Sequence, residues 1–114
     1  MKKTLIVKKP WGMFEQFTLN EKTTVKIITV KPKKRLSLQT HKNRSEFWRF
    51  LDNPAKVTKG NKTFRVKKGT EIFIPKKTKH RVEGLSKPAR FLEISFGTFN
   101  EEDIKRLEDD FSRE

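Results

Sequence analysis

The feature that most constrains the fold of this chain is a series of short runs in which apolar and polar residues alternate with a period of two. In the run at residues 24–31, Val25 and Ile27 share one face of an extended segment. A period of two is typical of β-strands, whose successive side chains point to opposite faces. Further runs lie at residues 35–41, 46–51, 55–59, 62–66, 71–74 and 89–96. Many short strands at close spacing predict an all-β sandwich or barrel.

Two local signals complete this expectation. Gly60-Asn61 separates two alternating runs and predicts a tight hairpin turn, because both residues tolerate positive φ. Near the end of the chain, Asn100 is suited to cap a helix, and three acidic residues follow it. An apolar stripe follows them, formed by Ile104, Leu107 and Phe111. We therefore expect a short C-terminal helix over residues 101–111.

The length of 114 residues indicates one domain, residues 1–114, with a core over about 9–99. Lys and Arg total 28 against 14 Asp and Glu, a net charge of +14, which suits a polyanion or a phosphorylated metabolite as partner. The longest basic run is Lys33-Lys34-Arg35, and no nucleic-acid-binding motif is evident, so we expect no specific nucleic acid and no membrane partner. The sequence has no Cys, which is compatible with the cytoplasm. A polyanion-binding module remains the competing hypothesis, which salt-dependent binding to DNA and RNA would test.

The two histidines, His41 and His80, lie in polar contexts at predicted strand edges. Odd positions of the run 35–41 share one face, which carries Arg35, Ser37, Gln39 and His41. Such a polar face either meets water or lines a functional cavity. A turn at residues 42–45 would bring Glu46 across from His41.

Gln39, His41, Glu46 and His80 would together form a mixed nitrogen and oxygen site. Two imidazoles and one carboxylate suit zinc, iron, manganese or cobalt, and spacing does not choose among these metals. From the residues alone, the alternative is that these side chains are ordinary surface groups.

The same residues carry a family resemblance. Gln39-x-His41 with Glu46, followed by Gly69-x5-Pro75-x4-His80, resembles the two cupin motifs, with Gln39 in place of the usual first His. The chain further resembles the cupin domain of type II mannose-6-phosphate isomerases, which is often fused to mannose-1-phosphate guanylyltransferase. The matching segments are Lys9-Pro10-Trp11-Gly12, residues 28–32, 35–39 and 44–48, Ile74-Pro75, residues 80–83 and residues 102–109. The sequence departs from the family pattern at Lys33, Lys34 and Lys77, where the family has glycine, and at Ser95-Phe96.

The resemblance implies a single-domain cupin, a small antiparallel β-barrel or jelly roll, that interconverts mannose 6-phosphate and fructose 6-phosphate. It implies one divalent metal ion held by Gln39, His41, Glu46 and His80, with zinc as first choice and manganese, cobalt, iron or magnesium as alternatives. No Gly-rich nucleotidyltransferase segment is evident, so we expect the isomerase half alone. The departures motivate an alternative, a metal-binding cupin with another sugar-related activity or with none.

Three further residues receive expected roles at this site. Arg44, beside Glu46 at the cavity rim, is expected to contact substrate and stabilise charge in the transition state. Glu93, on an apolar strand, is the candidate general base, or else a structural partner of Arg35. Arg35 either points into the cavity to bind substrate or pairs with an acid. The fold analogy also predicts a homodimer, because an open barrel of this size has strand edges to cover.

Overall fold

The computed structural model describes residues 4–111, and within this range the chain is all-β, with no helix. A four-stranded sheet has the order β3-β10-β5-β8, and a five-stranded sheet has the order β11-β4-β9-β6-β7. The bounds of the first sheet are β3 (Thr23–Val30), β10 (Ala89–Gly97), β5 (Arg44–Phe50) and β8 (Glu71–Ile74). Those of the second are β11 (Lys105–Glu108), β4 (Leu38–Thr40), β9 (His80–Gly84), β6 (Ala55–Lys59) and β7 (Lys62–Val66).

The two sheets enclose one apolar core between their inner faces. Trp48, Phe50 and Phe91 are among its largest fully buried side chains, and their rings pack edge-on or tilted with centroids 5.1–6.4 Å apart. Val57 and Val82 of the five-stranded sheet are also fully buried in this core. The all-β sandwich or barrel predicted from the alternating runs is therefore confirmed, and it has the form of two packed antiparallel sheets.

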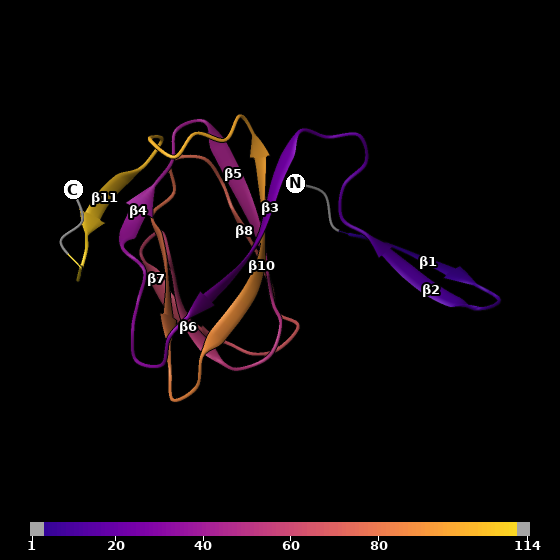
Figure 1. Cartoon of the computed structure of the whole chain (residues 1–114), viewed down its shortest axis with the longest axis horizontal. Coiled ribbons are helices and arrows are strands. Elements are labelled where there is room, and N and C mark those ends of the chain that lie inside the picture. Colours follow the sequence, from indigo (N-terminus) through magenta and orange to yellow (C-terminus); the bar gives the residue numbers. More distant parts are fainter. Residues whose placement is uncertain (1–3, 112–114) are drawn as a thin grey trace.

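A two-stranded hairpin, β1 (Leu5–Lys9) with β2 (Gly12–Gln16), extends away from the sandwich (Figure 1). Its base is attached to the four-stranded sheet, because Arg49 donates a hydrogen bond to Glu15 at 2.8 Å and Phe17 packs on Phe47. The sequence analysis did not predict these two strands.

The turn prediction at Gly60-Asn61 is confirmed. β6 and β7 pair from Ala55 opposite Val66 to Lys59 opposite Lys62, and Gly60 has φ +60°. Only Gly60 of the two turn residues uses positive φ.

The expected helix over residues 101–111 is wrong. Asn100 does accept a hydrogen bond from the backbone N–H of Glu102 at 2.9 Å, but the chain then becomes the strand β11. β11 pairs with β4, with Lys105 opposite Thr40 and Arg106 opposite Gln39. A helix of about three turns is marginal in water, whereas the open edge of β4 supplies ready hydrogen-bond partners. The pairing with β4 therefore overrides the local helical pattern.

Two lysines adopt the left-handed backbone conformation that favours glycine. Lys33 has φ +60° and Lys77 has φ +65°. Both stand where the resemblance expects glycine, and a residue with a side chain is strained in this conformation. In the part of the chain that the structure describes, no helix is long and apolar enough to cross a membrane.

Candidate metal centre

Four strands from both sheets converge on a cavity of about 190 Å³. His41 follows the end of β4, Glu46 lies on β5, His80 begins β9, and Glu93 lies on β10. Pairing in the sheets sets their relative positions: Gln39 of β4 lies opposite His80, and Glu93 lies opposite Trp48 of β5. The cavity is lined by Lys26, Ile28, Leu36, Gln39, His41, Arg44, Glu46, Trp48, His80, Glu93, Phe99, Glu101, Ile104 and Arg106.

The three candidate ligands His41, Glu46 and His80 meet inside this cavity. Nε2 of His41 lies 3.4 Å from Oε2 of Glu46, and Nε2 of His80 lies 3.6 Å from Oε1 of Glu46. One ligand atom from each residue can be chosen so that all lie within 4.8 Å of one another, and all three residues are buried. A buried set of two imidazoles and a carboxylate could hold a metal ion. The expected reversal does bring Glu46 beside His41, but it is shorter than the expected turn over residues 42–45, because β5 already begins at Arg44.

The hydrogen bonds of the two imidazoles fix which ring nitrogen is available. Nδ1 of His41 lies 2.7 Å from the carbonyl oxygen of Asp103, and Nδ1 of His80 lies 2.9 Å from that of Thr78. Because a carbonyl only accepts, each Nδ1 carries the proton and each Nε2 presents a lone pair to the cavity. Carbonyl groups orient metal-binding histidines in this way.

The electrostatics of the two histidines also fit a cation site. Burial lowers the pKa of His41 and lowers that of His80 to about 4, so both rings are neutral at pH 7. Nε2 of His80 is fully buried and has no hydrogen-bond partner among the described residues. An unpartnered buried acceptor facing a carboxylate is costly unless a cation or a donor fills the space between them. The donor set present therefore fits a metal ion.

Glu46 is held from two sides. Trp48 donates its indole N–H to Oε1 at 3.1 Å, and Arg44 approaches Oε2 through Nε at 3.5 Å. Nη1 of Arg44 donates to the carbonyl oxygen of Asn100 at 3.1 Å, and its guanidinium lies 4.4 Å from the centre of the Phe99 ring. Arg44 was expected at the rim of the cavity, but it is buried and directed at the carboxylate.

Glu93 also lies in the cavity, where its side chain is buried. Burial and then the neighbouring carboxylate of Glu46 raise the pKa of Glu93 to about 8. Lys26, directly opposite on β3, acts in the other direction and lowers it. Glu93 can therefore hold or release a proton near neutral pH.

Arg35 lies outside the cavity lining. Its guanidinium makes a two-pronged ion pair with Asp110, at 2.6 Å and 2.9 Å. Arg35 was expected either to point into the cavity or to pair with an acid. The structure shows an ion pair, and the acid is Asp110 and not Glu93. Gln39 does line the cavity, opposite His80.

Sequence reasoning missed three residues that shape the site, namely Lys26, Phe99 and Asp103. The sequence did contain a signal for Lys26. It is a basic residue on the same strand face as Ile28 and Val30, where the alternation would predict an apolar side chain. Asp103 was assigned to a helix, whereas its carboxylate accepts from the backbone N–H groups of Lys42 and Asn43 at 2.8 Å and 2.9 Å.

Comparison with known proteins gives the family. The model of the family described as mannose-6-phosphate isomerase C-terminal matches residues 1–109. The alginate biosynthesis protein AlgA of Pseudomonas aeruginosa is 38% identical over 109 residues, covering 94% of this chain and 23% of that protein. The mannose-1-phosphate guanylyltransferase RfbM of Salmonella typhimurium is 39% identical over 103 residues, covering 88% and 21%. The chain thus spans between a fifth and a quarter of the length of these relatives.

Solved structures give the fold independently. A cupin protein from Bacteroides fragilis superposes with a TM-score of 0.62 at 20% identity, covering 70% of this chain and 69% of that one. A mutant oxalate decarboxylase from Bacillus subtilis superposes with a TM-score of 0.68 at 24% identity, covering 77% and 25%. The fold is therefore that of a cupin, as the motifs indicated. Together with the match over residues 1–109, this shows that the chain belongs to the mannose-6-phosphate isomerase C-terminal family.

Proposed function

We propose that this chain interconverts mannose 6-phosphate and fructose 6-phosphate. The observation that carries the proposal is the convergence of His41, Glu46 and His80 with Glu93 in one cavity of a member of this family. The metal ion would be held by His41, Glu46 and His80, with Gln39 as the fourth ligand and zinc as first choice. When bound, a divalent ion supplies Lewis acidity to the sugar oxygens at C1 and C2.

Glu93 is proposed as the group that moves the proton between carbons. It takes the proton from C2 of the aldose, and the electron pair of that bond forms the C1–C2 double bond of an enediolate. Returning the proton to C1, while a second proton moves from the C2 oxygen to the C1 oxygen, gives the ketose. The reaction is balanced without an oxidant or a reductant, and a buried carboxyl group near neutral pKa suits both directions.

Arg44 is proposed to stabilise the negative charge that develops on the enediolate oxygens. Its guanidinium is held by the carbonyl of Asn100, the carboxylate of Glu46 and the Phe99 ring, and its Nη2 lies 3.4 Å from Nε2 of His41. Its orientation is therefore set before substrate arrives. Arg35 keeps its predicted role in substrate binding only if substrate displaces Asp110 from its guanidinium.

We also propose that the chain forms a homodimer. Support comes from apolar side chains exposed on two separate surfaces of the same chain. On the hairpin, Ile6 and Trp11 are 53% and 74% exposed, and on the outer face of the edge strand β3, Val25 and Ile27 are 58% and 60% exposed. In a two-fold pair, the hairpin of each copy would cover the β3 face of the other. A cytoplasmic location remains a prediction.

A coupled assay with mannose 6-phosphate, run with zinc, cobalt, manganese or magnesium, tests the isomerase. We expect turnover with at least one of these metals, and loss of turnover in His41→Ala and Glu46→Ala. The matched control is Glu21→Gln, which removes an exposed carboxylate away from the cavity. No turnover with any metal would reject the isomerase and leave the metal-binding cupin with another activity or with none. That alternative is motivated by the departures from the family pattern at Lys33, Lys34, Lys77 and Phe96.

A further inference from the structure

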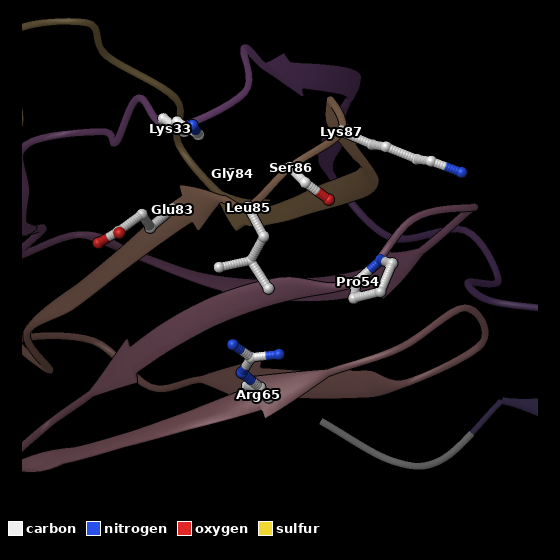
Figure 2. Close-up of a pocket in the computed structure, with 8 residues that line it drawn as sticks. All are labelled: Lys33, Pro54, Arg65, Glu83, Gly84, Leu85, Ser86 and Lys87. Atoms are coloured by element: carbon white, nitrogen blue, oxygen red, sulfur yellow. The ribbon is translucent and has the colours of Figure 1, made fainter.

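A second cavity lies at the other end of strand β9 from His80. Its volume is about 430 Å³, larger than that of the candidate metal centre. Gly84 at the end of β9 lines it, four residues from His80 and therefore about 14 Å away along the strand. The cavity is lined by Lys33, Pro54, Arg65, Glu83, Gly84, Leu85, Ser86 and Lys87, and Figure 2 shows these side chains.

The charges around this cavity are unbalanced. Lys33, Arg65 and Lys87 contribute three positive charges, and none of them takes part in an ion pair with another described residue. The only acid in the lining is Glu83, and in Figure 2 its carboxylate points away from Arg65. Arg65 instead extends from β7 towards the side chain of Leu85 (Figure 2). Unpaired cations around a hollow favour an anionic occupant.

The wall that carries Lys33 is rigidly built. The backbone N–H of Lys33 donates to the carbonyls of both Gly84 and Leu85, at 3.1 Å and 3.0 Å. Gly84 allows this close approach, because a Cβ there would lie 2.4 Å from the carbonyl oxygen of Lys31. Lys33 has positive φ because it is the third residue of a turn closed by the backbone N–H of Lys34, which donates to the carbonyl of Lys31 at 3.1 Å.

We propose that this second cavity binds a small phosphate monoester. The guanidinium of Arg65 offers paired donors that match phosphate oxygens, and Lys33 adds charge at the rim. The side chain of Lys87 extends away from Arg65 (Figure 2) and contributes to the positive charge at longer range. Ser86 adds a hydroxyl, while Leu85 and Pro54 give an apolar wall for the organic part of the ligand. A volume of about 430 Å³ lies within the range of small-molecule sites. This site is separate from the proposed isomerase centre and does not depend on isomerase activity.

Calorimetric titration and amide NMR of the 114-residue chain test the proposal, with inorganic phosphate and phenyl phosphate as probes at an ionic strength of about 0.15 M. We expect chemical-shift changes at Gly84, Leu85 and Ser86 with both probes. Phenyl phosphate should bind several-fold more tightly than inorganic phosphate, because its ring contacts the apolar wall. Equal affinity of the two probes would overturn the assignment to a monoester.

The matched variants are Arg65→Gln and Lys62→Gln, which remove one positive charge each from strand β7. Arg65→Gln should weaken phosphate binding by about tenfold, since it removes charge-assisted hydrogen bonds, and Lys62→Gln by less than about twofold. If the two variants weakened phosphate binding equally, the affinity would depend on net charge alone, and the proposed site would be rejected. Shift changes confined to the amides around His41 and His80 would overturn it as well.

Discussion

The indole N–H of Trp48 donates to Oε1 of Glu46, the same oxygen that faces Nε2 of His80. A side chain of the apolar core therefore orients a candidate metal ligand through this hydrogen bond, so a change in the core at Trp48 can alter the position of Glu46.

Replacing Trp48 by Phe keeps an aromatic ring in the core and removes this donor. We expect metal affinity to fall by about 10- to 100-fold, because groups that orient a ligand contribute on that scale. Competition with a chromogenic chelator measures the affinity. Trp11→Phe, at a largely exposed position on the hairpin, is the matched control. Unchanged affinity in Trp48→Phe would show that the indole N–H does not position Glu46.

Removing the metal ion should destabilise the chain. A ligand that binds only the folded state raises stability by about 2.7 kcal/mol at a concentration of 100 times its Kd, equivalent to a rise in Tm of about 10 °C for a chain of this size. A chelator should therefore lower Tm by about this amount, as followed by circular dichroism. His41→Ala should melt at the same temperature with and without chelator. A chelator-sensitive Tm in His41→Ala would contradict the ligand assignment.

Glu93→Gln tests the proton carrier. We expect kcat to fall by about 10²- to 10⁴-fold, because general acid–base catalysis contributes on that scale, with KM and metal content nearly unchanged. The coupled assay and elemental analysis give these quantities, and Glu21→Gln is the control. Activity within a few-fold of the wild type would assign the proton transfer to another group.

Lys77→Gly should stabilise the protein. Lys77 is held at φ +65°, which costs a residue with a side chain about 1 kcal/mol and costs glycine little. We expect the free energy of unfolding to rise by about 0.5–1 kcal/mol in urea denaturation. Lys76→Gly, at the preceding exposed position without positive φ, should lower it. If both substitutions changed the free energy of unfolding equally, the positive φ of Lys77 would not be a source of strain.

The homodimer is tested by light scattering after size exclusion at micromolar concentration. We expect a mass of twice 13.5 kDa. Val25→Lys should shift the mass towards the monomer, because it places a charge on the exposed face of β3, whereas Thr63→Lys on β7 should not. A monomeric wild type would reject the homodimer.

The sequence predicted the strands that build the sandwich because their alternation reflects burial on one face. It also predicted the meeting of His41 with Glu46, since a reversal after His41 brings the following strand back beside it. It did not predict β11, because the pairing of Arg106 with Gln39 depends on an edge that exists only in the folded sheet. Likewise, the sequence did not predict that Arg35 pairs with Asp110. The two residues are 75 positions apart, and the local pattern around either one carries no information about this contact.

The carbonyl of Asp103 that orients His41 lies 62 positions further along the chain. Strands β5 to β10 lie between the two residues in the sequence, so this contact forms only when segments far apart in the chain have come together. If the segment around Asp103 detached, the interior of the sandwich could persist, but His41 would lose the carbonyl that orients its ring. The proposed metal site would therefore depend on this segment in a way that the apolar core does not.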